Sequence, residues 1–121
     1  MNLELTLHDI EQATGGAIAG GDSSAIVRSL STDTRQLRPG EWFLALRGEN
    51  FDGHDFLELA LAKGAAGLIF DRRLARREEL GRAPAALAVD DTLWAYGAIA
   101  QAWRRRLDPQ VACIVGSGGK T

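Results

Sequence analysis

Residues 55–70, DFLELALAKGAAGLIF, contain a helix pattern that is followed directly by a strand pattern. The residues at helical spacing are Phe56, Leu59, Ala60 and Lys63. Gly64 is a typical residue to end a helix, and AAGLIF is the short apolar run of a fully buried strand. A helix that leads into a buried strand is typical of folds in which helices cover a partly parallel sheet.

The same alternation continues to the end of the chain. Residues 85–90, AALAVD, predict another buried strand, and residues 91–109 predict a helix that begins at Asp91 or Thr92. The helix has a basic last turn, which suits the helix dipole. Residues 110–116, QVACIVG, predict a last strand. The order helix, strand, strand, helix, strand predicts an α/β layer structure with at least partly parallel strands.

The first half of the chain predicts mixed strands and helices. Residues 6–16 predict a helix with Thr6 as its cap and two glycines at its end. Residues 17–35 contain two short apolar runs around a Gly-Gly-Asp-Ser-Ser turn, which favours a hairpin or an extended pair. Residues 42–46 favour a compact strand, and the charged residues 71–84 predict a loop or a surface helix.

Size and composition indicate one ordinary globular domain. The chain has 121 residues, of which 45% are hydrophobic and 25% charged, so it is long enough to bury a core. A net charge of −2 provides no basic field, so we expect no nucleic-acid partner. The N-terminus lacks an apolar signal sequence, and no apolar run is long enough to span a membrane, so we expect no membrane insertion. The single Cys113 excludes an internal disulfide, which favours a soluble protein of a reducing compartment.

The end of the chain reads GSGGKT after a strand pattern, which is typical of a phosphate-binding loop. Glycines let backbone N–H groups turn onto phosphate oxygens, a lysine reaches the terminal phosphates, and a hydroxyl binds Mg²⁺. The candidate ATP-binding residues are Gly116, Ser117, Gly118, Gly119, Lys120 and Thr121. The common spacing places another glycine where this chain has Ile114, so the match is to the shorter form G-x-x-G-K-T. From these residues alone, an ordinary turn or a chance match is the alternative.

A second polar cluster lies in residues 31–56, STDTRQLRPGEWFLALRGENFDGHDF. The hydroxyls and backbone amides at its start, STDTR (31–35), can bind a diphosphate. Arg35 can pair with that diphosphate through two N–H groups. Phe51 can stack on a nucleobase, with an amide at the edge of the base. The alternative is purely structural: Asp33 and Thr34 cap a turn, Arg35 pairs with Asp33, and an aspartate caps the next helix.

In this order the motifs resemble the N-terminal part of the Mur ligases, the ATP-dependent amide-forming enzymes of peptidoglycan precursor synthesis. The resemblance covers nearly the whole chain. It depends on four strings: STDTR (31–35), PGEWFLALRGE (39–49), FDGHDF (51–56) and GSGGKT (116–121). The short phosphate loop is the form that this family uses, which accounts for Ile114.

The resemblance implies two parts of unequal size. Residues 1–108 are implied to be an N-terminal domain that binds the UDP-N-acetylmuramoyl-peptide. Residues 109–121 are implied to be the first strand and phosphate loop of a central ATP-binding domain, which is truncated here. Family members have three domains, so we expect this 121-residue chain to be inactive alone.

The family's substrate contacts can be carried over residue by residue. The residues implied to bind the substrate are Thr32, Thr34, Arg35, Glu49, Asn50 and Phe51. Thr32 and Thr34 match positions that contact the uridine diphosphate, and residues 49–51 match a loop that lies against the uridine. Arg35 shapes the turn at least as readily as it contacts the ligand.

The resemblance also implies the reaction and its cofactors, ATP and Mg²⁺. The peptide carboxylate becomes an acyl phosphate, which the amine of D-alanyl-D-alanine attacks; Lys120 contacts the phosphates as the candidate catalytic residue, and Thr121 binds the metal. The string ALRGENFDGHDF is most similar to the family members that add D-alanyl-D-alanine. Members that add a diamino acid to UDP-N-acetylmuramoyl-L-alanyl-D-glutamate, or a non-catalytic UDP-sugar-binding module, are the alternatives. We expect a cytoplasmic monomer.

Overall fold

The structure is a computed structural model that describes residues 2–74 and 81–107. These ranges contain a six-stranded sheet with helices packed on it, which confirms the predicted α/β class. The strands are β1 (Asn2–Thr6), β2 (Ala17–Gly20), β3 (Ile26–Ser31), β4 (Trp42–Leu44), β5 (Gly67–Asp71) and β6 (Ala86–Val89). The helices are α1 (Leu7–Thr14), the short 3₁₀ helix η1 (Gly53–Phe56), α2 (Leu57–Ala62) and α4 (Thr92–Leu107).

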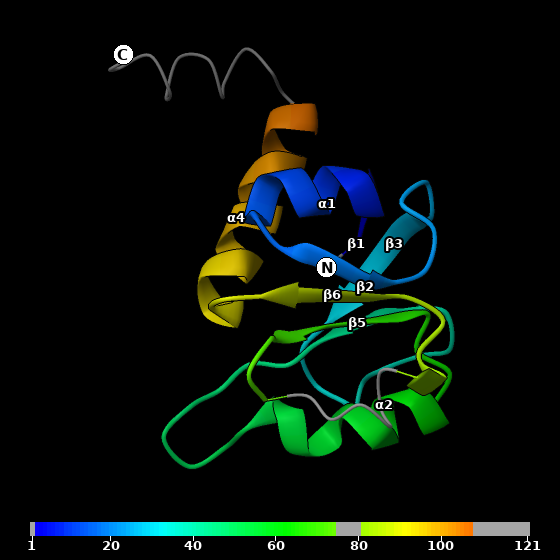
Figure 1. Cartoon of the computed structure of the whole chain (residues 1–121), viewed down its shortest axis with the longest axis vertical. Helices are drawn as coiled ribbons and strands as arrows, with labels where there is room; N and C mark the ends of the chain where they lie inside the picture. Colours follow the sequence, from blue (N-terminus) through cyan, green and yellow to red (C-terminus); the bar gives the residue numbers. More distant parts are fainter. Residues whose placement is uncertain (1, 75–80, 108–121) are drawn as a thin grey trace.

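The sheet has a parallel centre and antiparallel edges. Its strands lie in the order β1-β3-β4-β5-β6-β2. β3, β4, β5 and β6 run parallel to one another, whereas β1 and β2 each run antiparallel to their neighbour. Parallel neighbours need a crossover connection, and α2 lies in the crossover from β4 to β5 (Figure 1). The predicted partly parallel sheet is therefore confirmed.

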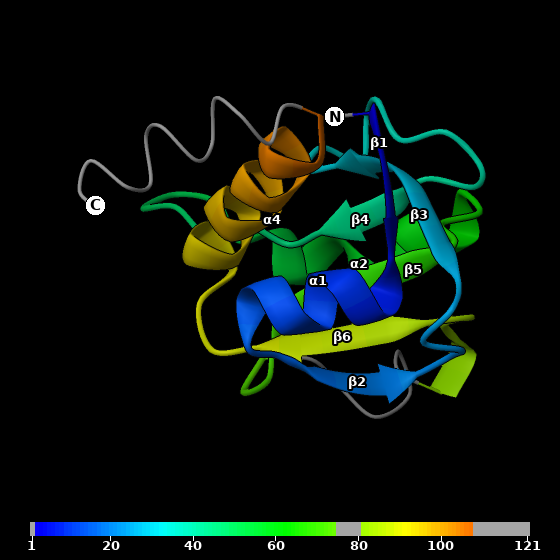
Figure 2. The same ribbon diagram turned by 90° about the horizontal axis from the view of Figure 1, so that it is seen from above.

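Helices cover both faces of this sheet. α1 and α4 lie on one face and α2 lies on the other (Figures 1 and 2). β5 is buried along its whole length: Ile69 packs into the core beneath α1 and α4, whereas Leu68 and Phe70 pack in the core beneath α2. Burial on both faces explains why this strand is a continuous apolar run in the sequence.

The predicted helix caps are confirmed. The Thr6 hydroxyl accepts the Asp9 N–H at 3.1 Å, and the Asp9 carboxylate accepts the Thr6 N–H at 3.0 Å, which is a capping box at the start of α1. Gly15, with a φ of 71°, ends that helix in the left-handed region. The Asp91 carboxylate caps α4 by accepting two N–H groups of its first turn.

Of the two expectations for residues 17–35, the hairpin is wrong, whereas both apolar runs are extended strands, β2 and β3. β2 pairs with β6 at one edge of the sheet, whereas β3 pairs with β1 and with β4. Because β3 has a neighbour on each side, no edge is left for β2 to pair with it. β1, which the sequence analysis did not assign, occupies the place of the expected hairpin partner.

The helix predicted from Asp55 is shorter and buries a different face. α2 begins at Leu57, after η1, and it buries Leu57 and Ala60, whereas Leu59 is 44% exposed. Lys63, which the helical spacing placed on the apolar face, instead donates from its ammonium to the backbone carbonyl of Thr34 at 2.6 Å. This contact connects the end of α2 to the turn after β3.

Residues 109–121 lie outside the described residues, and with them the predicted last strand and the phosphate loop. The described part of the chain has no helix that is long and apolar enough to cross a membrane.

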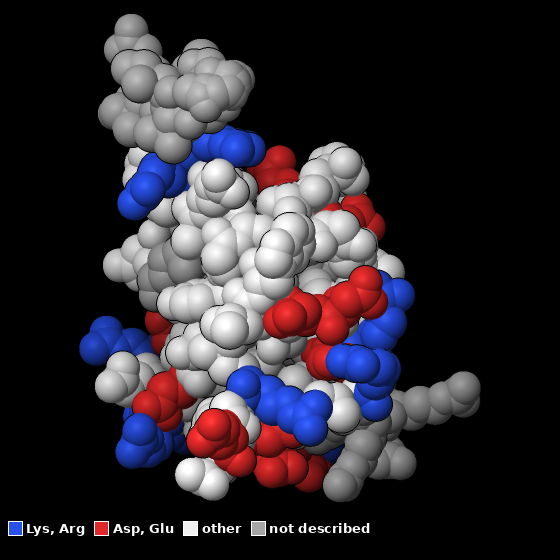
Figure 3. All heavy atoms as spheres, turned by 90° about the vertical axis from the view of Figure 1, so that its left-hand side faces the viewer, with Lys and Arg blue, Asp and Glu red and all other residues white. Residues whose placement is uncertain are grey.

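On the face that carries α4, a broad area without charged side chains lies between charged groups above and below it (Figure 3). Leu93 and Trp94, at the start of α4, are exposed apolar side chains.

Candidate functional site

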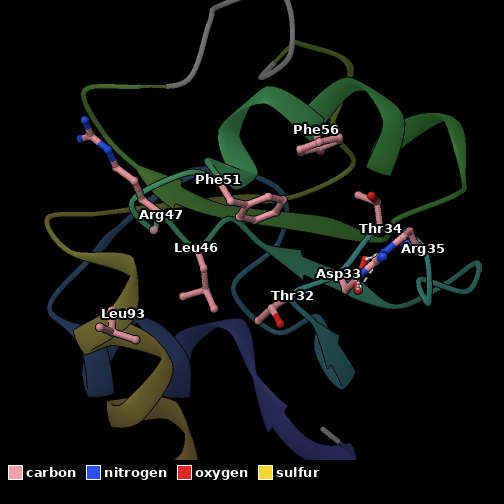
Figure 4. A pocket seen from close by; sticks show the side chains of 10 residues that line it. Thr32, Asp33, Thr34, Arg35, Leu46, Arg47, Phe51, Phe56 and Leu93 are labelled. Atoms are coloured by element: carbon pink, nitrogen blue, oxygen red, sulfur yellow. Dashed lines mark hydrogen bonds and ion pairs between the residues drawn. The ribbon is translucent and has the colours of Figure 1, made fainter.

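A cavity of about 690 Å³ lies where β3 and β4 end, beside the first turn of α4 (Figure 4). Since β3 and β4 are parallel, their carboxyl ends meet at one edge of the sheet, where ligands bind in open α/β sheets. Its lining comprises Thr32, Asp33, Thr34 and Arg35 after β3, Leu46, Arg47, Gly48 and Phe51 after β4, and Phe56 and Leu93 from helices. We call this the main cavity.

The main cavity brings together most of the predicted substrate-binding residues. The predicted residues that line it are Thr32, Thr34, Arg35 and Phe51. Glu49 and Asn50 are exposed in the same loop, but they do not belong to the lining. The residues that the sequence analysis missed are Leu46, Arg47, Gly48, Phe56 and Leu93. Leu46, Arg47 and Gly48 could have been found, because they lie at the end of the strand predicted at residues 42–46 or directly after it. Leu93, in contrast, reaches the cavity only through the packing of α4.

Two threonine hydroxyls in the lining are available to a ligand. Within residues 2–74 and 81–107, neither the Thr32 nor the Thr34 hydroxyl makes a hydrogen bond. Thr34 is nevertheless only 6% exposed. A buried polar group without a partner costs roughly 1–3 kcal/mol, so a ligand oxygen beside it would recover that free energy.

Arg35 is paired with Asp33 in the turn after β3. Its guanidinium lies 2.9 Å from the carboxylate, and its Nε donates to both carboxylate oxygens at 3.1 and 3.2 Å (Figure 4). This side-chain hydrogen bond lowers the pKa of Asp33 below its ordinary value. The structural alternative for these two residues is therefore present. The Arg35 side chain is 87% exposed, which leaves its other N–H groups open to a ligand.

Arg47 lines the main cavity, but its guanidinium points away from the other labelled lining residues (Figure 4). Within the described part of the chain, the Arg47 guanidinium makes no ion pair or hydrogen bond. The lining residues thus include one carboxylate, Asp33, and two guanidinium groups; that of Arg35 pairs with Asp33, and that of Arg47 interacts electrostatically with Asp52. The exposed Arg35 guanidinium and the two threonine hydroxyls are therefore the groups in this lining that suit an anionic ligand.

The loop after β4 is a tight turn that brings an aromatic ring to the cavity. Gly48 N–H donates to the carbonyl of Phe51, and Gly53 N–H donates to the carbonyl of Leu46, both at 2.6 Å. A Cβ on Gly53 would lie 2.9 Å from backbone atoms of residues 45 and 46, so the turn requires glycine there. Phe51 stacks on Phe56 with ring centroids 5.4 Å apart, and both rings line the cavity.

His54 connects this loop to the end of β5. Its ring is buried, with 4% of the side chain exposed. Nε2 accepts the backbone N–H of Asp71 at 2.9 Å, so Nδ1 carries the proton and donates to the Asp52 carboxylate at 2.7 Å. Asp52 also accepts the backbone N–H of His54 and thereby caps η1, as one of the structural alternatives predicted. His54 therefore fixes the residue next to Phe51 against the sheet.

Asp71, the last residue of β5, provides a test of how stability depends on pH. Arg73 donates to both of its carboxylate oxygens, at 3.0 and 2.6 Å, and this lowers the pKa of Asp71 from 3.8 to about 2. Because the folded-state pKa is the lower one, the stabilisation is complete above about pH 4 and is lost as the pH falls towards 2. We expect Asp71→Asn to lower the free energy of unfolding at pH 7 by about 1–2 kcal/mol, since solvent screens the exposed Arg73.

Urea unfolding of the wild type and Asp71→Asn at pH 7, 5 and 3 measures this difference. The difference in unfolding free energy between the two proteins should be the same at pH 7 and pH 5 and smaller at pH 3. Asp90→Asn is the matched control, because Asp90 pairs with Arg72 on the surface with 86% of its side chain exposed, and it should change stability little. A difference that stays constant down to pH 3 would contradict the lowered pKa of Asp71 beside Arg73.

The predicted ATP and Mg²⁺ residues are not placed by the structure. Gly116 to Thr121 lie outside the described residues, so Lys120 and Thr121 stay predictions. Within the described ranges, no group of three or more His, Cys, Asp or Glu side chains could bind a metal ion. What the structure describes is thus a cavity that combines threonine hydroxyls and an exposed guanidinium with an aromatic side.

Comparisons with known proteins agree on one family. The family model described as "Mur ligase family, catalytic domain" matches residues 26–104. The UDP-N-acetylmuramoyl-tripeptide–D-alanyl-D-alanine ligase of Synechocystis sp. is 40% identical over an alignment of 124 positions, which covers 100% of this chain and 27% of that protein.

Solved structures give a similar result. MurF from Acinetobacter baumannii superposes with a TM-score of 0.73 at 32% identity and covers 91% of this chain and 23% of its own. MurF ligase from Thermotoga maritima in complex with ADP superposes with a TM-score of 0.50 at 27% identity, over 62% of this chain and 16% of its own. This chain therefore spans about a quarter, or less, of the length of these relatives.

Proposed function

Because this chain belongs to the Mur ligase family, we propose that it binds the UDP end of a UDP-N-acetylmuramoyl-tripeptide, to which a ligase adds D-alanyl-D-alanine. The product is a peptidoglycan precursor. The observation that carries the proposal is the main cavity, which combines free threonine hydroxyls, the exposed guanidinium of Arg35 and stacked aromatic rings. A uridine diphosphate has the matching parts, two phosphates and a flat base.

The two ends of the cavity suit the two ends of a uridine diphosphate. The turn after β3 supplies Thr32, Thr34 and Arg35, so we assign the diphosphate to this side. The stacked rings belong to Phe51 in the loop after β4 and to Phe56 at the end of η1, so we assign the uracil to them. Glu49 and Asn50 belong to the same exposed loop, and we propose that they approach the uridine from outside the lining.

The ligase reaction needs more than these residues. Mur ligases are ATP-dependent, and the Thermotoga relative was solved with ADP. We propose that the carboxylate of the bound peptide is activated as an acyl phosphate, with Lys120 on the ATP phosphates and Thr121 on Mg²⁺. In this proposal residues 1–108 are the substrate-binding domain, residues 109–121 begin the ATP-binding domain, and the 121-residue chain alone is inactive. The cytoplasmic location and the monomeric state stay predictions.

Titration with UDP tests the proposed site. Replacement of Thr32 and Thr34 together with valine removes both hydroxyls and keeps the side-chain volume, so the fold should persist. Hydrogen bonds to charged groups contribute roughly 1.5–3 kcal/mol each, so we expect UDP affinity to fall by about tenfold or more. Isothermal titration calorimetry of the wild type and the double variant measures the change.

Thr92→Val is the matched control for this titration. Thr92 is also buried, and its hydroxyl makes no hydrogen bond within residues 2–74 and 81–107, but it lines a different cavity. Its replacement should leave UDP affinity unchanged. If the double variant bound UDP as tightly as the wild type, the assignment of the threonines would fail. If the wild type did not bind UDP, the proposed function would fail.

A further inference from the structure

The ammonium group of Lys63 binds the turn after β3 from outside the main cavity. It donates to the backbone carbonyl of Thr34 at 2.6 Å, although Lys63 is not part of the cavity lining. The N–H of Leu37, another residue outside the lining, donates to the same carbonyl at 3.4 Å. These contacts hold the peptide group of Thr34, the residue whose buried hydroxyl faces the cavity without a partner in the described ranges.

The backbone of Lys63 is itself fixed at the end of α2. Its N–H donates to the carbonyl of Leu59 at 3.0 Å. Gly64 follows with a φ of 90°, and its carbonyl accepts the N–H of Gly40 at 2.9 Å. A Cβ on Gly64 would lie 3.2 Å from the Cβ of Pro39, so the end of α2 also packs closely on the turn before β4. The ammonium therefore reaches Thr34 from a rigid support.

The charge of Lys63 is not neutralised by a direct partner. Within residues 2–74 and 81–107, its ammonium makes no ion pair, and its hydrogen bond goes to a neutral carbonyl. Its field nevertheless reaches the turn, where Asp33, Thr34 and Arg35 lie together (Figure 4). The pKa of Asp33 is lowered first by the hydrogen bond from the Arg35 side chain, and the charge of Lys63 adds to this effect. The same field attracts an anion bound at the turn.

We propose that Lys63 is a positioning residue for the diphosphate, because it fixes the turn after β3 and adds positive potential behind it. This inference rests on the proposed function, which assigns the diphosphate to this turn. A turn that has lost its support must be ordered again on binding, and this cost lowers affinity. The stacked rings of Phe51 and Phe56 do not depend on Lys63, so the uracil should bind equally well without it.

Titration with UDP and with uridine separates the two parts of the ligand. Uridine carries the base without the phosphates, so the ratio of the two affinities measures what the diphosphate contributes. Lys63→Met keeps the long side chain and removes the ammonium. We expect it to lower UDP affinity about threefold to tenfold, the effect of one lost hydrogen bond, and to leave uridine affinity within about twofold. NMR chemical shifts can follow both titrations, including that of the weaker ligand.

Two further variants control for charge. Lys63→Arg keeps a positive charge and a donor for the Thr34 carbonyl, so it should keep the ratio within about twofold of the wild-type value. Arg28→Met is the matched control, because Arg28 is exposed on β3 and lies outside the lining of the main cavity. It removes the same net charge and should change neither affinity.

The ratio of affinities decides the outcome. The proposal is overturned if Lys63→Met leaves this ratio unchanged, whether both affinities fall equally or neither falls, since Lys63 would then only support the fold. It is also overturned if Lys63→Arg loses as much UDP affinity as Lys63→Met. If Lys63→Met does not fold, Lys63→Gln is measured in its place and judged in the same way. In all these cases the wild type still binds UDP and the proposed function stands; if the wild type does not bind UDP, both fail.

Discussion

Trp42→Ala is expected to lower the free energy of unfolding by about 3–5 kcal/mol. Trp42 is 2% exposed and lies in the middle of the sheet, where it pairs with Leu30 of β3 and with Gly67 of β5. Its ring covers Gly67, because a Cβ at that glycine would lie 2.5 Å from the ring atoms. Removal of the ring would leave a cavity that Gly67 has no side chain to fill. The loss of stability should therefore lie near the upper end of that range.

Trp94→Ala is the matched control, since Trp94 is 61% exposed on α4 and the chemical change is the same. Urea unfolding followed by far-UV circular dichroism measures both variants without relying on tryptophan fluorescence. The control should lose much less stability than Trp42→Ala. Equal losses would contradict the burial of the Trp42 ring in the middle of the sheet.

The sequence predicts the central strands because their burial is visible locally. β4 and β5 are buried on both faces, so Trp42, Phe43 and Leu44, like residues 67–70, form uninterrupted apolar runs. β1 was missed although Leu3 and Leu5 alternate with exposed residues, because only five residues separate the chain start from the helix cap. The partner of β2 could not be predicted, because the residues Ala17–Gly20 do not show by themselves which distant strand they pair with.

The candidate site was predictable where it directly follows a strand. Thr32, Thr34 and Arg35 come immediately after β3, so their position at the sheet edge follows from the strand itself. Leu93 reaches the main cavity from α4, far along the chain, and only the packing of that helix brings it there. The ion pair of Arg35 with Asp33 was one of two interpretations of the same string, and three-dimensional geometry was needed to establish it.

His54→Ala is expected to lower the free energy of unfolding by about 2–4 kcal/mol and also to weaken UDP binding. The substitution empties a buried site and leaves the Asp71 N–H without its acceptor. Asp52 also loses the Nδ1 donor, so the turn that carries Phe51 is no longer fixed to β5. An aromatic wall that moves must be ordered again on binding, and this cost should appear as lower affinity.

Two further variants separate a loss of stability from a loss of the position of the Phe51 loop. His8→Ala is the matched control, because His8 lies on α1 with 58% of its side chain exposed, and it should change neither stability nor affinity. His54→Gln places an amide oxygen near the former Nε2, so it should restore part of the UDP affinity by accepting the Asp71 N–H again. If His54→Ala lowered stability but left UDP affinity at the wild-type value, His54 would be a core residue that does not position the loop.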